Sequence, residues 1–156
     1  MTNALSAHTP SSDTVKELRR HLDGGTQIER MLKCKSLSPE SKEKLIELLN
    51  SHDRVLVRSI ISNADSFADI GTHLGRIMAE NLTAGNGVWA DPMVSVEAAE
   101  SLGRLYRRQP ARAAEDGVAA AIEEAFKSQR ITPQKYRACM NAIELGHDPI
   151  VPRTTY

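Results

Sequence analysis

Features that define several common protein classes are missing from this sequence. It has only two cysteines in 156 residues, Cys34 and Cys139, and no C-x-x-C motif, which disfavours a structural zinc site. Cys34 has no identifiable histidine base, and Cys139, on a predicted helix, is expected to be a small buried apolar residue. No residue pattern requires a metal or another cofactor, and we therefore expect none.

Long apolar runs are also missing. No stretch of about 18 consecutive apolar residues occurs, which disfavours a membrane-spanning helix. The first residues, MTNALSAHTPSSD, contain neither a basic region nor an apolar region, as a secretory signal peptide would. We therefore expect a cytoplasmic protein with no membrane partner.

Alternating strand patterns and internal repeats of fixed period are missing as well, whereas helical periodicity recurs along most of the chain. The length corresponds to about one domain. We therefore predict an all-α fold, a single compact domain of about seven to eight helices. The expected organisation is a mobile leader at 1–12, an all-helical domain at 13–146 and an extended or disordered tail at 147–156.

The longest helical pattern runs from Asp53 to Thr83. Large apolar residues recur there at steps of three, four or seven: Leu56, Ile60, Phe67, Ile70, Leu74, Met78 and Leu82. A neighbouring row is small, with Ala68, Gly71, Gly75 and Ala79 after Ala64. This row lets another helix approach closely, either within the chain, with the Ala-rich segment 111–129 as its partner, or in a homo-oligomer. Poor helix formers near Asn63 predict two segments rather than one helix.

Capping and helix-breaking residues predict where the other helices begin and end. The predicted signals are a stop at Gly24-Gly25, caps at Thr26, Ser38, Ser95 and Thr132, one alanine-rich helix over 111–129, and a stop at Gly146.

Adjacent histidine and aspartate residues prompt a test for a metal-dependent phosphohydrolase of the HD type. His52-Asp53 would be the ligand pair, with His21 before it and Asp116 or Asp148 after it, a donor set that suits a divalent metal. The polar residues around His52-Asp53 instead favour a turn and a helix cap. Phosphohydrolase activity is therefore a remote alternative.

Two acid-free basic stretches are the clearest charge signal. Residues 1–100 carry 11 Lys/Arg and 14 Asp/Glu, whereas residues 101–156 carry 9 and 6. The first stretch contains Arg104, Arg107, Arg108 and Arg112, and the second contains Lys127, Arg130, Lys135 and Arg137. A DNA- or RNA-binding regulator would use Arg107, Arg108, Lys127, Arg130, Lys135 and Arg137 against phosphates. The segment from Ile122 to Ile143 matches a helix-turn-helix poorly, because Phe126 and Arg130 occupy positions that favour small residues.

The only tryptophan, Trp89, lies in a break of about ten residues between helical segments, where it either anchors the loop or contacts a partner. No catalytic grouping is assembled by the sequence. We therefore expect a small cytosolic regulator, adaptor or inhibitor that binds another protein through Trp89, Arg104, Arg107, Arg108 and Arg112, and that is not an enzyme.

Overall fold

A computed structural model describes residues 24–33, 36–68 and 73–147, and every regular element in these ranges is a helix. After a helix at 24–32 follow α3 (Pro39–Leu49), α4 (Arg54–Ser62), α5 (Ala64–Ala68), α6 (Leu74–Ala84), the 3-10 helix η1 (Gly87–Ala90), α7 (Pro92–Leu105), α8 (Pro110–Glu115), α9 (Val118–Lys127) and α10 (Pro133–Leu145). The all-α prediction is confirmed. The predicted leader, and the predicted tail beyond residue 147, lie outside the described ranges.

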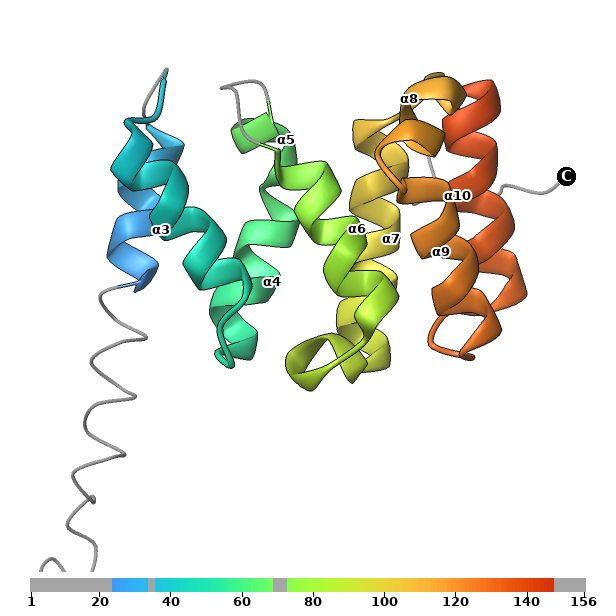
Figure 1. Cartoon of the computed structure of the whole chain (residues 1–156), viewed down its shortest axis with the longest axis horizontal. Helices are drawn as coiled ribbons and strands as arrows, with labels where there is room; N and C mark the ends of the chain where they lie inside the picture. The colour runs from blue at the N-terminus through green and yellow to red at the C-terminus, as the bar shows by residue number, and fades with distance from the viewer. Residues whose placement is uncertain (1–23, 34–35, 69–72, 148–156) are drawn as a thin grey trace, which may run out of the picture.

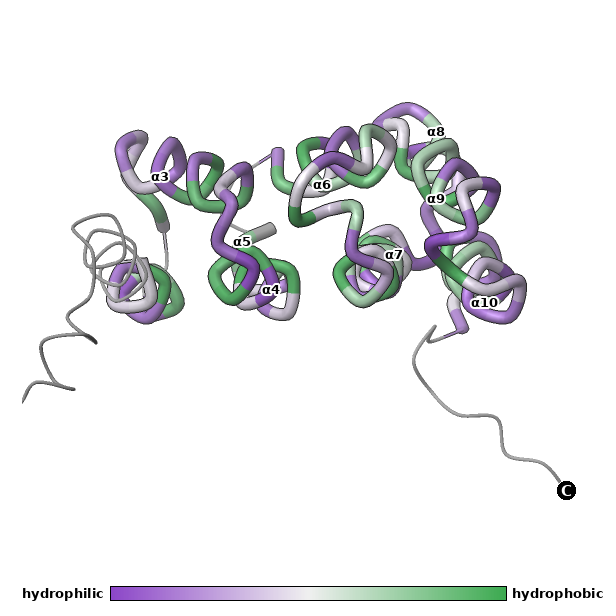
Figure 2. Tube along the Cα trace, turned by 90° about the horizontal axis from the view of Figure 1, so that it is seen from below, coloured by the Kyte–Doolittle hydropathy of each residue, from purple (hydrophilic) through white to green (hydrophobic). Residues whose placement is uncertain are grey.

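The long helices alternate between two layers, as Figure 2 shows. One layer contains α3, α6 and α9, and the other contains the helix at 24–32, α4, α7 and α10. Along the layers α6 packs against α9, and α7 packs against both α4 and α10; across the layers α3 packs on α4, α6 on α7 and α9 on α10. The helices thus form an array along the long axis of the molecule (Figure 1), in which each helix mainly contacts its neighbours.

One apolar cluster runs through the whole array. Its buried residues extend from Ile28 to Ile143, so the N-terminal and C-terminal helices share a continuous core. Within the central stretch the predicted large apolar row is buried at Leu56, Ile60, Phe67, Leu74, Met78 and Leu82, while Ile70 lies outside the described residues. The periodicity of that stretch therefore identified its buried face correctly.

The central stretch breaks at Asn63, as its sequence predicts. α4 ends at Ser62, and the Asn63 side chain donates from Nδ2 to the Ser59 carbonyl oxygen at 2.7 Å. A side chain that bonds the backbone in this way competes with helix propagation. The second segment is itself divided, because α5 ends at Ala68 and α6 begins at Leu74.

The row of small residues serves packing within the chain. Gly75 and Ala79 are buried on α6, and α6 packs against the Ala-rich α9. A β-carbon at Gly75 would lie 2.3 Å from the Tyr106 hydroxyl oxygen, so only glycine fits beneath this ring. The self-association surface expected here therefore has no exposed face at Gly75 or Ala79, while Gly71 and the Ala68 side chain lie outside the described residues.

Several predicted caps are confirmed. The Ser38 side chain accepts a hydrogen bond from the Ser41 N–H, and the Thr132 side chain accepts one from the Lys135 N–H. Gly146 ends α10 with φ 86°, in the left-handed region that favours glycine.

Four predicted boundaries are wrong. Residues 24–26 are helical, so Gly24-Gly25 is no stop and Thr26 is no cap. A β-carbon at Gly24 would lie 2.5 Å from Leu56 Cδ1, so this glycine permits close packing. Asp91, not Ser95, caps α7, because its side chain accepts from the Met93 N–H. Residues 111–129 form two helices instead of one, since Gly117 adopts φ 78° between α8 and α9.

Ion pairs tie α7 to its neighbours on both sides. Arg58 on α4 donates from Nε and Nη2 to the two carboxylate oxygens of Glu97 on α7, at 2.8 and 2.9 Å. Lys135 on α10 donates to Glu100, one turn further along α7. Acidic residues of the middle helix therefore meet basic residues of both adjacent helices.

Substitution of two glycines by alanine should have opposite effects on stability. Gly75→Ala should lower the free energy of unfolding by about 1–2 kcal/mol, because the new methyl group displaces Tyr106 and this exceeds the gain in helix propensity. Gly25→Ala, where a β-carbon meets nothing within 4 Å, should raise it by about 0.5–1 kcal/mol. Urea unfolding measures both, and equal effects would contradict the assigned packing.

Candidate functional site

The connection between α6 and α7 is anchored by Trp89. This side chain is 3% exposed, and its Nε1 donates to the Leu49 carbonyl oxygen at 3.3 Å. The Trp89 carbonyl oxygen accepts a hydrogen bond from the buried Ser95 hydroxyl at 3.2 Å. The prediction that Trp89 contacts a partner is therefore corrected: the indole packs inside the chain, which is the anchoring role.

Arg104 and Arg112, two of the predicted partner-binding arginines, are close to carboxylates of this chain. Arg104 Nε lies 4.0 Å from Asp65 Oδ2. Arg112 Nε lies 4.0 Å from Asp116 Oδ2, and its guanidinium carbon lies 5.7 Å from the centre of the Tyr106 ring. Both side chains therefore take part in contacts at the ends of α7 and α8.

Asp116 is the centre of that contact region. It accepts a hydrogen bond from the Tyr106 hydroxyl at 2.6 Å and another from Arg76 Nη2 at 3.0 Å. The bond from Tyr106 holds the pKa of the Asp116 carboxyl below its usual value, and the Arg76 and Arg112 charges add to this. Burial raises the pKa of the Tyr106 hydroxyl, so it stays protonated as a donor. The cluster therefore connects α6, α7 and α8.

Arg108 is held by its backbone rather than by an ion pair in the described structure. Its φ is 60°, an unusual conformation for a residue with a β-carbon, and its N–H donates to the Ala142 carbonyl oxygen at 3.0 Å. Its aliphatic side chain lies over Gly146, where a β-carbon would be 2.6 Å from Arg108 Cγ. Arg107 precedes it and is partly buried. Arg108 therefore joins the end of α7 to the end of α10.

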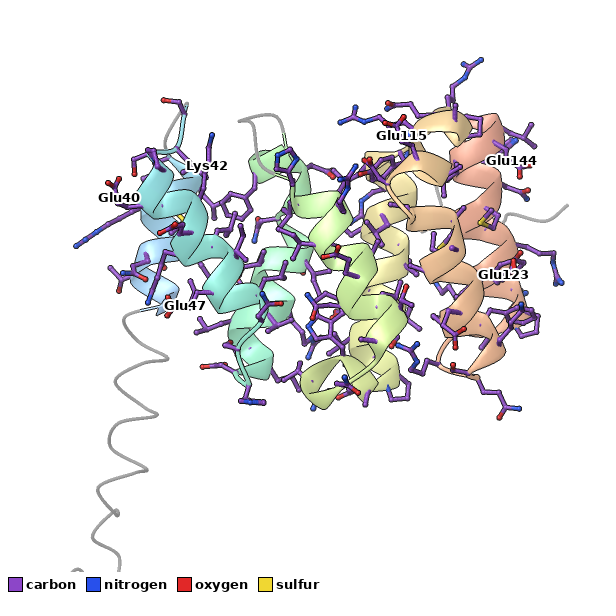
Figure 3. All side chains as sticks on the ribbon, in the orientation of Figure 1. Glu40, Lys42, Glu47, Glu115, Glu123 and Glu144 are labelled. Carbon is purple, nitrogen blue, oxygen red and sulfur yellow. The ribbon has the colours of Figure 1, made fainter. Side chains whose placement is uncertain are left out.

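Two basic residues of the second stretch form ion pairs within the chain. Lys127 pairs with Glu123 at 3.0 Å, and Lys135 pairs with Glu100. Arg137 is exposed on α10. Acids lie on the same helices, with Glu115 on α8, Glu123 on α9 and Glu144 on α10, as labelled in Figure 3. Lys127 and Lys135 are thus paired within the chain, and the nucleic-acid surface stays a prediction.

Arg130 differs from Lys127 and Lys135 because its hydrogen-bond acceptors are neutral. Its Nη1 donates to the Trp89 carbonyl oxygen at 3.4 Å and to Ser95 Oγ at 3.3 Å. No carboxylate within the described ranges is in ion-pair contact with it, and partial burial lowers the pKa of the guanidinium. The Glu124 charge acts in the opposite direction and raises this pKa, but no carboxylate within the described residues accepts a hydrogen bond from the guanidinium.

A largely apolar groove of about 690 Å³ lies beside Arg130. It is lined by Pro92, Val96, Phe126, Lys127, Gln129, Arg130, Ile131, Thr132 and Pro133, from the start of α7, the end of α9, the connection that follows and the start of α10. Phe126 stacks on Tyr136 with ring centres 4.6 Å apart, which holds one wall in place. Groove volumes between about 300 and 1,000 Å³ with few polar groups are typical of ligand sites.

The His52-Asp53 pair forms a turn and a cap, as predicted. Asp53 Oδ1 accepts from the Val55 and Leu56 N–H groups, both at 3.1 Å, and thereby starts α4. His52 is exposed, while His21 and Asp148 lie outside the described residues. Within the described ranges no group of three or more His, Cys, Asp or Glu side chains is placed to hold a metal ion.

Cys139 is fully buried, as its sequence context predicts. Burial raises the pKa of its thiol to about 12, so the nucleophilic thiolate is scarce at neutral pH. Cys34 lies outside the described residues.

The sequence alone indicates neither the contacts around Asp116 nor the groove. In the sequence Asp116 is a candidate only as a remote metal ligand, and no local pattern connects it with Tyr106 or Arg76. The groove combines residues from α7, α9 and α10, so no single stretch of sequence indicates it. A usable signal was the pair Thr132-Pro133, which follows Arg130 and Ile131 and predicted the end of the connection that forms the groove.

Tyr106→Phe should weaken the fold in a pH-dependent way. Loss of the hydroxyl donor should lower the free energy of unfolding by about 1–2 kcal/mol near neutral pH. Because the Asp116 pKa is lowered in the fold, its contribution is present above the ordinary aspartate pKa of about 4 and is lost as the pH falls through the lowered value.

The measurement for this prediction is urea unfolding at several pH values. The difference between wild type and Tyr106→Phe should shrink below about pH 4. Tyr136→Phe, which keeps the stacked ring, is the matched control and should show little difference at any pH. A Tyr106→Phe difference that does not change with pH would contradict the role of Asp116.

Trp89→Ala should destabilise the fold rather than remove a surface contact. Loss of the buried indole should cost about 3–5 kcal/mol, and Trp89→Phe should cost less because it retains most of the buried volume. Circular dichroism during thermal unfolding measures both. Unchanged stability of Trp89→Ala would contradict the anchoring role of this side chain.

No helix within the described ranges is long and apolar enough to cross a membrane. Comparisons of the chain with protein-family models, with curated proteins and with solved structures found no match. The assignment of a function therefore depends on the contacts and the groove of this chain itself.

Proposed function

We propose that this protein is a cytosolic regulator or adaptor that binds another protein and has no catalytic activity of its own. The observation that supports this proposal is the open, largely apolar groove between the start of α7, the end of α9 and the start of α10. An exposed apolar depression bordered by polar groups is typical of a recognition surface.

The engagement of reactive groups in structural contacts favours binding over catalysis. The Cys139 thiol is buried and protonated, Asp53 caps α4, and Asp116 accepts bonds from Tyr106 and Arg76. Each of these groups has a role in folding that accounts for its position. The proposal therefore assigns no reaction to them.

The arrangement of charge favours a protein partner over DNA or RNA. Phosphate binding requires several cations on one surface. Here Lys127 and Lys135 form ion pairs with acids of the chain. The exposed Glu115 of α8, Glu124 of α9 and Glu144 of α10 would also repel a phosphate backbone.

Two measurements on the full chain test the proposal. Cross-linked pull-downs from the source cells, compared with an unrelated helical protein of similar charge on the same resin, should retain a defined protein. Fluorescence anisotropy with labelled duplex and single-stranded DNA should show no submicromolar binding at low salt. Tight DNA binding that falls steeply with salt, together with no retained protein, would overturn the proposal in favour of nucleic-acid recognition.

A further inference from the structure

The groove beside Arg130 combines an apolar surface with charge of one sign. Its apolar lining comes from Pro92, Val96, Phe126, Ile131 and Pro133, and its charged lining consists of Lys127 and Arg130. None of the nine lining residues is acidic. An apolar side chain with a neighbouring carboxylate would complement both properties.

The backbone beside Arg130 is fixed by the end of α9. The Gln129 N–H donates to the Phe126 carbonyl oxygen at 3.0 Å, and the Arg130 N–H donates to the Ala125 carbonyl oxygen at 2.9 Å. This is the Schellman pattern of helix ends, with Gln129 at φ 61° where glycine is usual. Arg130 therefore enters the groove from a defined position and not from a loose loop.

Of the two charges in the groove, that of Arg130 is the more specific for a ligand. Lys127 already pairs with Glu123, whereas Arg130 has only neutral acceptors and is partly buried. A guanidinium that is already partly removed from water costs less to desolvate further on binding. A carboxylate that reaches it would form a charge-assisted hydrogen bond, which is among the stronger single contacts in proteins.

From these observations we infer that the groove binds a short acidic–apolar segment of a partner protein, with an apolar side chain against Val96, Phe126 and Ile131 and a carboxylate on Arg130. This inference rests on the proposed protein-binding function and names the class of ligand.

A second copy of the chain is a less suitable occupant. Among the described residues, the element that matches best is Leu145, which is 61% exposed, next to the exposed Glu144 at the end of α10. The groove lies at the start of the same helix, so the contact would be head-to-tail and would extend into chains of molecules instead of closing.

The test is a selection of peptides from a random dodecapeptide library displayed on phage, with the folded full chain as the target. Selected peptides should share an apolar or aromatic residue with Asp or Glu close to it. Their affinity is then measured by fluorescence anisotropy for wild type and for three variants.

The variants separate the groove from the rest of the surface. Arg130→Gln removes the charge, Val96→Trp fills the apolar part and keeps Arg130, and Arg137→Gln removes an exposed cation outside the groove as the matched control. The first two should weaken binding at least about tenfold, and the control should not change it. Thermal unfolding shows whether each variant is folded. If Arg130→Gln is unfolded, the binding measured for Val96→Trp decides the test.

Three outcomes would overturn the inference. They are a selection without binders, selected peptides without acids, and peptides that bind Val96→Trp as tightly as wild type. Sedimentation that shows self-association of wild type but not of Val96→Trp would assign the groove to a second copy instead. If a protein is retained in the pull-downs while the groove variants change nothing, the proposed function stands and uses another surface.

Discussion

The close approach of α6 to the end of α7 determines much of this structure. The Tyr106 ring lies over Gly75, in space that any β-carbon would occupy, and its hydroxyl reaches Asp116 at 2.6 Å. Asp116 also holds Arg76, so one contact joins both layers to the turn after α8. Because that turn directs α9 back onto α6, the position of the C-terminal helices depends on a residue with no side chain.

Charges in the described C-terminal half are also balanced by contacts within the chain. The net charge is zero, and most described cations of the C-terminal half are close to an acid of the chain or to a carbonyl oxygen. Exposed ion pairs of this kind contribute little to stability but keep the surface from presenting a field of one sign. Under the proposed function, recognition then depends on local shape, and the groove beside Arg130 offers both an apolar lining and a cation whose hydrogen-bond acceptors are neutral.

The sequence predicted well those features that depend on residues close together in the chain. The Ser38 and Thr132 caps, the break at Asn63 and the stop at Gly146 each depend on residues a few positions apart. The predictions were wrong where a distant residue decides the outcome. Gly24 was expected to end a helix, but it faces Leu56. The burial of Trp89 requires Leu49, and the groove requires three helices. The order of the two layers could not be predicted from the sequence. The helices of one layer, α3, α6 and α9, begin at Pro39, Leu74 and Val118, so they do not recur at a fixed spacing.

The ion pairs along one layer also bear on how such an array assembles. An array of similar helices can pair with the wrong neighbour or slip by one turn, since apolar faces discriminate poorly between partners. Glu97 and Glu100 lie one turn apart on α7, and each meets a cation from a different side, Arg58 of α4 and Lys135 of α10. Exchange of neighbours or a slip of one turn would leave these acids without their cations. The alternation of charge thus encodes the order of the helices, whatever its small contribution to total stability.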